Sequence, residues 1–199
     1  MFHKFMGASA LAIAIALGTA GVQAQQQQQQ QQQAQQQPVA QAKKADKEAQ
    51  DFIKTAIQHN IAEIDTGKLA QEKAKHDAVK QFGAMMVKDH SEALEKAKAT
   101  AKILDVEPPE SADMMHQAAY LKMKVLQGDT FDRSYINDMV QDHEKDVKEF
   151  EKMAGMGGPA ADHAKEVLPK LKHHLAEAKK LDAQLNQATV GSGNTSQSK

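Results

Sequence analysis

The sequence predicts an all-α protein, a four-helix bundle with a short extra helix in the central connection. Residues 46–187 consist almost entirely of Ala, Lys, Glu, Gln, Leu, Met and Asp, and they show no strand-like alternation. Apolar residues recur in this region at spacings of three and four, which is typical of helices that bury one face. A predicted cap at Asp77 and the prolines and glycines that follow divide it into four long stretches and a short one, and this number of amphipathic helices predicts a bundle.

The N-terminal segment is predicted to be an export signal. Residues 1–24 combine the basic Lys4, a short apolar run at residues 11–17 and small residues that allow cleavage after Ala24. The apolar run is too short to anchor the chain stably in a bilayer, and no later run approaches its length. We therefore expect a mature chain without a transmembrane segment, located in the periplasm or secreted.

Low-complexity segments flank the predicted bundle. Residues 25–45 are rich in glutamine, and residues 188–199 are rich in Ser, Gly and Thr. Such compositions bury little apolar surface, so we predict a disordered linker and a disordered tail. The region between them, residues 46–187, has the size of one domain.

The first two bundle helices are predicted at residues 46–74 and 77–104, with Asp77 as the N-cap of the second. The apolar face of the first helix contains Phe52, Ile53, Ala56, Ile57 and Ile64. The stripe of the second contains Val79, Phe82, Met86, His90, Ala93, Ala97, Ala101 and Leu104.

Two prolines, Pro108 and Pro109, end the second helix. A shorter helix follows at residues 111–127, and the third bundle helix is predicted at residues 131–154. The fourth begins near Pro159, which suits a first helical turn. Pro169 lies inside it and is predicted to kink or split it. The leucines of its apolar stripe are Leu168, Leu171, Leu175 and Leu185.

A short phrase in the second bundle helix is repeated in the third. Residues 86–90, with the sequence MVKDH, recur 53 residues later as residues 139–143, with the sequence MVQDH. An aromatic residue, Phe82 or Tyr135, stands four positions ahead of each phrase. The repeat predicts two helices that present the same surface, each with a histidine at the same depth.

The two repeated histidines are candidate metal ligands. At about 100° per residue, His90 and His143 lie within roughly 20° of the centre of their apolar faces. On the other two helices, His174 and Glu63 occupy the edges of the apolar faces. Three imidazoles and a carboxylate are a plausible ligand set for zinc, iron or copper.

Two aspartates precede the repeated histidines and are expected to support the site. Asp89 and Asp142 are displaced sideways on their helices, where each is positioned to orient a histidine of a neighbouring helix. The Glu-x-x-His pattern of di-iron bundles is absent around them, so oxygen chemistry at a di-iron centre is not favoured.

Other interpretations of these residues remain open. Buried histidines are often hydrogen-bonded core groups, and the chain would then be a metal-free envelope protein that acts in stress tolerance or through interactions. Copper(I) binding by thioethers and an imidazole is another alternative. Its residues would be Met85, Met86, Met114, Met115, His116 and Met123. Three further histidines are expected at the surface or its boundary: His59, His76 and His163.

Composition excludes several functional classes. The chain has no cysteine, no Gly-x-Ser-x-Gly elbow and no glycine-rich phosphate loop, so it does not indicate an enzyme. Lys and Arg number 25 against 26 Asp and Glu, which does not favour nucleic acid as a partner. We expect a monomer.

Five segments together resemble a known bacterial family, that of exported ferritin-like four-helix proteins of unknown function, often labelled outer-membrane or periplasmic proteins. The segments are residues 62–70, 82–90, 128–135, 139–143 and 168–175. The resemblance covers residues 50 to about 182, and it implies a ferritin-like fold and export but no established activity. The positions that match the family's motifs are Glu63, Asp89, His90, Asp142, His143 and His174.

Overall fold

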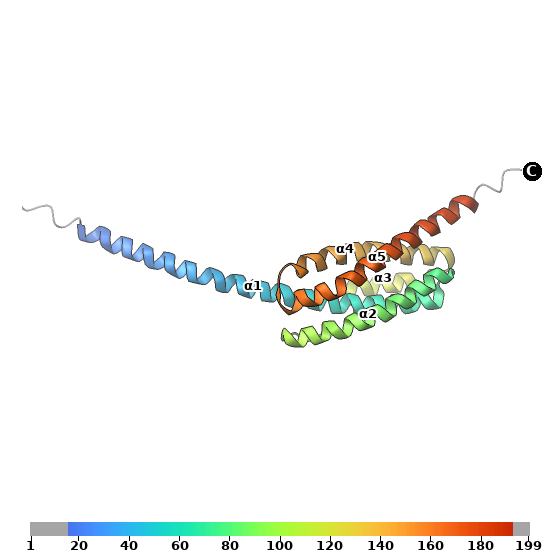
Figure 1. Ribbon diagram of the computed structural model, residues 1–199, viewed down its shortest axis with the longest axis horizontal. Coiled ribbons are helices and arrows are strands. Elements are labelled where there is room, and N and C mark those ends of the chain that lie inside the picture. Colours follow the sequence, from blue (N-terminus) through green and yellow to red (C-terminus); the bar gives the residue numbers. More distant parts are fainter. Residues whose placement is uncertain (1–15, 193–199) are drawn as a thin grey trace, which may run out of the picture. The chain divides into compact units, whose positions relative to one another are not determined.

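The computed structural model describes residues 16–192, and within this range the protein is all-α, without a strand. Five helices follow one another along the chain: α1 (Ala16–Lys73), α2 (Asp77–Ile103), α3 (Met114–Lys124), α4 (Gly128–Ala154) and α5 (Gly158–Ser192). From Asp46 onward the chain forms one compact unit. In this unit the end of α1 packs lengthwise with α2, α4 and α5, and α3 lies in the connection from α2 to α4 (Figure 1). This confirms the predicted four-helix bundle and its short extra helix.

The N-terminal segment differs from the prediction made from its composition. Residues 25–45 were predicted to be a disordered linker, but the backbone from Ala16 to Lys73 is one helix that includes the glutamine tract. Glutamine is a good helix former, and extending an existing helix is far easier than starting one. Residues 1–15 and 193–199 lie outside the described residues, so the signal peptide at 1–24 and most of the disordered tail at 188–199 stay predictions.

The turn between α1 and α2 is closed by a buried aspartate rather than by the predicted cap. Helix α2 begins at Asp77, and its N-cap is His76, which makes no capping bond with its side chain. The carboxylate of Asp132 on α4 accepts hydrogen bonds from the backbone N–H groups of Lys75 and His76 and from Nδ1 of His76. These N–H groups would otherwise be unsatisfied, so Asp132 ties the turn to α4.

The connection from α4 to α5 follows the expected turn chemistry. Gly157 and Gly158 have φ values of 86° and 80°, a conformation that glycine adopts at no steric cost. Pro159 then lies in the first turn of α5, as predicted. Pro169 does not split this helix, because α5 runs unbroken from Gly158 to Ser192.

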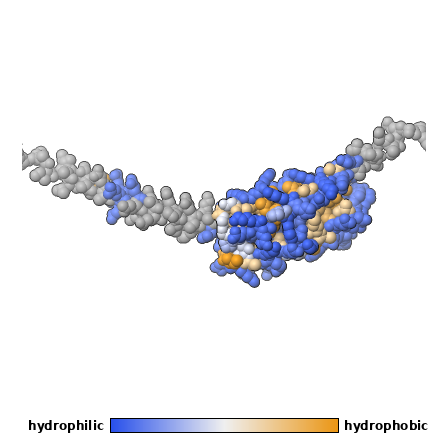
Figure 2. Space-filling view, viewed as in Figure 1, coloured by the Kyte–Doolittle hydropathy of each residue, from blue (hydrophilic) through white to orange (hydrophobic). Residues whose placement is uncertain are grey.

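Two apolar clusters fill the bundle, one toward each end. One contains Val79, Phe82, Met86, Phe131, Tyr135, Met139, Ala178 and Leu181. The other contains Ile53, Ile57, Ala93, Ala97, Phe150, Ala164 and Leu171. The surface seen in Figure 2 is largely hydrophilic, as expected for a bundle in water. Within residues 16–192, no helix combines the length and the apolar character needed to cross a bilayer.

Helices α1 and α2 approach each other closely at a pair of glycines. A Cβ added to Gly83 would lie 2.8 Å from the backbone oxygen of Gly67 and 2.9 Å from Cβ of Ala70. A Cβ added to Gly67 would in turn lie 2.9 Å from the backbone oxygen of Gly83. Since backbone atoms cannot rotate away, only glycine permits this approach.

We expect Gly83→Ala to destabilise the fold by about 1–2 kcal/mol. Alanine favours helix over glycine by roughly 1 kcal/mol, but overpacking against backbone costs about 1–3 kcal/mol. Urea unfolding followed by circular dichroism measures the difference. Gly155→Ala is the matched control, because its Cβ would meet nothing nearer than 3.5 Å and its stability should change by less than about 0.5 kcal/mol. Equal effects in the two variants would contradict the close approach of α1 and α2.

Candidate metal centre

Three buried imidazoles converge between the two apolar clusters. They belong to His90 on α2, His143 on α4 and His174 on α5, with exposed fractions of 4%, 0% and 1%. Their ring centroids lie 5.2 to 5.7 Å apart. One ring nitrogen from each histidine lies within 4.8 Å of the other two, which is close enough for a single ion to contact all three. We call these residues the histidine triad.

The orientation of His90 is fixed by a neighbour on α1. Nδ1 of His90 lies 2.9 Å from Oδ1 of Asn60. The amide nitrogen of Asn60 donates to the backbone oxygen of Ala56 at 2.7 Å, so its oxygen faces the histidine. Nδ1 of His90 therefore carries the proton, and Nε2 keeps its lone pair.

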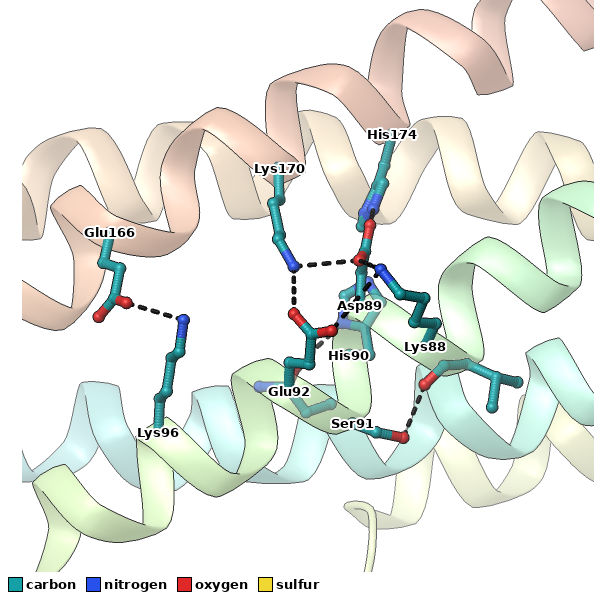
Figure 3. A network of polar contacts seen from close by, with 11 residues as sticks. Lys88, Asp89, His90, Ser91, Glu92, Lys96, Glu166, Lys170 and His174 are labelled. Carbon is teal, nitrogen blue, oxygen red and sulfur yellow. Dashed lines mark hydrogen bonds and ion pairs between the residues drawn. The ribbon is translucent and has the colours of Figure 1, made fainter.

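The other two imidazoles are oriented in the same manner by groups that can only accept. Nδ1 of His143 donates to the backbone oxygen of Met139 at 2.9 Å. Nε2 of His174 donates to Oδ2 of Asp89 at 3.0 Å, and Figure 3 shows that contact between α2 and α5. In each ring the proton is on the nitrogen that faces the acceptor. The second nitrogen is left with a lone pair.

Asp89 is held in place by a lysine of α5. Nζ of Lys170 lies 3.0 Å from Oδ1 of Asp89 and 2.6 Å from Glu92, and it thereby bridges two carboxylates of α2 (Figure 3). Partial burial raises the pKa of Asp89, but the hydrogen bonds from His174 and Lys170 outweigh burial and lower it. Asp89 is therefore ionised and remains an acceptor for His174.

The remaining ring nitrogens of the triad have no partner. Nε2 of His90, Nε2 of His143 and Nδ1 of His174 are buried, and none makes a hydrogen bond within the part of the chain that the structure describes. A buried acceptor without a partner costs about 1–3 kcal/mol. Lone pairs of neutral imidazoles are the kind of ligand that zinc and copper ions bind.

The surroundings keep the triad uncharged. Burial, followed by the charges of His143 and His174, lowers the pKa of His90 well below its ordinary value. Burial also lowers the pKa of His143 to about 4. The pKa of His174 is lowered by burial, although Asp89 opposes the change. Neutral imidazole is the form that binds metal, so the triad is ready for an ion at neutral pH.

The structure does not bring Glu63 or Asp142 into the triad. Glu63 is buried at 4% exposure, but burial and the charges of Asp142 and Asp146 raise its pKa well above the ordinary value. The group of ligand atoms that lie within 4.8 Å of one another contains the three histidines and not Glu63. Asp142 lies near His59 and His116, whose charges act on its pKa. The helical positions of Glu63 on α1 and Asp142 on α4 alone did not determine which neighbouring helix each side chain faces.

Several residues of this region have roles that the sequence reasoning missed. Asn60 was not singled out, although a polar residue on the face of Ile57 and Ile64 was a usable signal. His163 was expected at the surface or its boundary, yet it is buried at 4% exposure, and neither of its ring nitrogens makes a hydrogen bond to any residue that the structure describes. His59 is half-buried and contacts Asp146 through Nδ1 at 2.9 Å.

The methionines of the copper alternative do not gather at one place. Met86 belongs to an apolar cluster, whereas Met114 is 86% exposed. Met115, His116 and Met123 line one open groove beside α3 and α4. The six residues therefore do not form a single thioether site.

The fold and this group of residues define a four-helix bundle with three buried histidines. Residues 32–181 match the family described as a domain of unknown function, DUF4142, and the chain belongs to that family. The predicted membership in a family of unknown function is thereby confirmed, whereas export stays a prediction. No curated protein matches the chain.

A solved structure shares the fold. It is the crystal structure of a DUF305 fragment from Deinococcus radiodurans, with a TM-score of 0.60 and 14% sequence identity. The similarity covers 70% of this chain and 96% of the other. At this identity the likeness supports the helical fold and says nothing of the site.

Acidification should destabilise the metal-free protein through His143. Its pKa falls from 6.5 to about 4 on folding, so its stabilising contribution is complete above pH 6.5 and is lost as the pH falls toward 4. For His143 alone, we expect the free energy of unfolding to fall by about 1 kcal/mol between pH 7.5 and pH 5.5. Urea unfolding in the presence of a chelator measures it. His143→Gln cannot titrate there and should show a smaller loss than wild type; an identical loss would contradict the assignment.

Proposed function

We propose that this protein is an exported bundle that binds one transition metal ion through His90, His143 and His174. The observation that supports the proposal is the pairing of each imidazole with an outward acceptor. That pairing leaves one lone pair in each ring buried and unpartnered. Metal-binding histidines characteristically donate their other N–H to a carboxylate or a carbonyl, and this arrangement does so three times.

The ligand set favours zinc or copper over iron. Three neutral imidazoles suit zinc and copper, whereas non-haem iron sites typically add a carboxylate to two histidines. The carboxylate predicted for that role, Glu63, does not join the triad. Three protein ligands leave one tetrahedral position of a zinc ion open to a small ligand or water.

A metal-free structural role for the histidines is the competing explanation. A buried histidine stabilises the fold most when both ring nitrogens make hydrogen bonds, because each unpaired buried acceptor costs about 1–3 kcal/mol. Here all three rings leave a nitrogen unpaired. Bound metal would satisfy all three acceptors at once, so the geometry favours the metal-binding function.

We expect the double variant His90→Ala, His143→Ala to lose one equivalent of bound metal relative to wild type while it keeps its helical content. Isothermal titration of the untagged full-length chain with Zn²⁺ and with Cu²⁺ gives the stoichiometry, and circular dichroism gives the helicity. Metal at 100 times its Kd should also stabilise wild type by about 2.7 kcal/mol and raise its Tm, and a chelator should reverse this.

His163→Ala is the matched control for the double variant. It also removes a buried histidine with unpartnered nitrogens, but that side chain lies beside Phe150, away from the triad. It should keep the wild-type stoichiometry. If the double variant kept it as well, the assigned ligands would be wrong; if neither metal bound wild type, the histidines would be packing groups.

The carboxylate that orients His174 should tune affinity without changing stoichiometry. Asp89→Asn keeps an oxygen that can accept from His174 but loses the charge, and we expect metal affinity to fall by about tenfold. Glu92→Gln is the matched control, because Glu92 contacts the same Lys170 yet is not a hydrogen-bond partner of His174. Equal losses in the two variants would assign the effect to Lys170 rather than to the acceptor of the imidazole.

A further inference from the structure

A second pair of histidines lies outside the triad, where α1 meets α3. The ring centroids of His59 and His116 are 4.6 Å apart. Together with Asp113 they form a group in which one ligand atom from each residue lies within 4.8 Å of the others. All three side chains are partly exposed, in contrast to the buried triad.

Both imidazoles of this pair are oriented by carboxylates. Nδ1 of His59 lies 2.9 Å from Oδ1 of Asp146, so its Nε2 is the atom available to a ligand. Burial lowers the pKa of His59, but the hydrogen bond and charge of Asp146 outweigh it, and the pKa is raised. Asp146 of α4 therefore orients the ring of His59 on α1, and Nε2 of His59 remains available.

Both carboxylate oxygens of Asp113 contact residues at the start of α3. Oδ1 of Asp113 accepts the backbone N–H groups of Met115 and His116 and so caps α3. Oδ2 contacts Nδ1 of His116. The cap fixes the carboxylate beside the two rings, so that it can coordinate an ion together with them.

The surrounding charge and space favour a cation. An open groove of about 560 Å³ runs along α3 and α4, and His116, Asp138 and Asp142 line it together with Lys122 and Lys145. With Asp113 and Asp146, carboxylates outnumber lysines in this region. Burial raises the pKa of Asp142, and the charges of His116 and His59 oppose that rise, which places Asp142 near both rings. The groove gives an ion direct access from solvent.

We propose that His59, His116 and Asp113 form a second, solvent-accessible site for a divalent transition metal ion. Two imidazoles and a carboxylate are the ligand set of many zinc sites. Asp146 orients His59, and Asp142 adds negative charge. The site shares no ligand with the triad, so it does not depend on the function proposed for the triad.

Zn²⁺ titration of the untagged full-length chain tests this site. Wild type should bind two equivalents, and His116→Ala should bind one. The remaining equivalent of His116→Ala should disappear when His90→Ala and His143→Ala are added. Loss of Zn²⁺ to a chelator should be faster from the open site than from the triad, and it should show two phases in wild type and one in His116→Ala.

His173→Ala is the matched control, because this exposed histidine also neighbours another histidine, His174, at a centroid distance of 6.4 Å. The His173→Ala variant should still bind two equivalents of Zn²⁺. Asp113→Asn is a second variant, and it should keep the cap of α3 and so remain folded, since asparagine also caps helices. We expect it to weaken the second site by at least about tenfold and to leave the triad unchanged.

The experiments can refute the second site and the triad site independently of each other. If His116→Ala and Asp113→Asn bind Zn²⁺ as wild type does, the second site is refuted, whatever the triad binds. If wild type binds one equivalent that His116→Ala loses and the triad double variant keeps, the second site stands and the triad assignment falls. Zn²⁺-dependent shifts of the His59 and His116 ring signals in NMR spectra of the triad double variant would support the second site, and unchanged signals would refute it.

Discussion

The bundle depends on how it accommodates a layer of polar side chains between two apolar clusters. On α2, His90 lies between Met86 of one cluster and Ala93 of the other, and on α5, His174 lies between Leu171 and Ala178. Burial removes water from these side chains, so each polar atom needs a partner inside the bundle or a bound ligand. The triad satisfies one nitrogen per ring and leaves the other for a ligand.

The positions of the helices give one ring nitrogen of each imidazole in the triad a hydrogen-bond acceptor. The contact of Gly67 with Gly83 brings α1 against α2, and this proximity keeps Asn60 within 2.9 Å of His90. Asp89, held by Lys170, fixes His174 across the contact of α2 with α5. Backbone and side-chain acceptors thereby select the tautomer of every ring, and that choice leaves each buried imidazole of the triad with one lone pair that no hydrogen bond within the described residues uses.

The sequence predicted what depends on a single helix and missed what depends on the angle between helices. Periodicity gave the bundle, and the repeated phrase placed His90 and His143 at one depth. An edge position such as that of Glu63 faces either neighbour equally well in sequence, and the structure gathers the three histidines without it. The pairing of His59 with His116 could not be predicted, because α3 is short and its crossing over α1 and α4 is set by the loops. The glutamine tract shows the same limit: composition indicated disorder, while its high helix propensity allowed α1 to extend through it.

The two proposed metal sites differ in the charge that each would offer a cation. The triad contributes no negative ligand, so a divalent ion there keeps its charge in a buried place, with Asp89 behind His174 as the nearest hydrogen-bonded compensation. Such a site excludes hard ions such as Mg²⁺ and Ca²⁺, which need oxygen ligands to offset their loss of water. At the groove, Asp113 and Asp146 supply that compensation, and solvent remains close. For the two proposed sites, electrostatics therefore predicts rapid, weakly selective metal binding at the groove and slow, selective metal binding in the core.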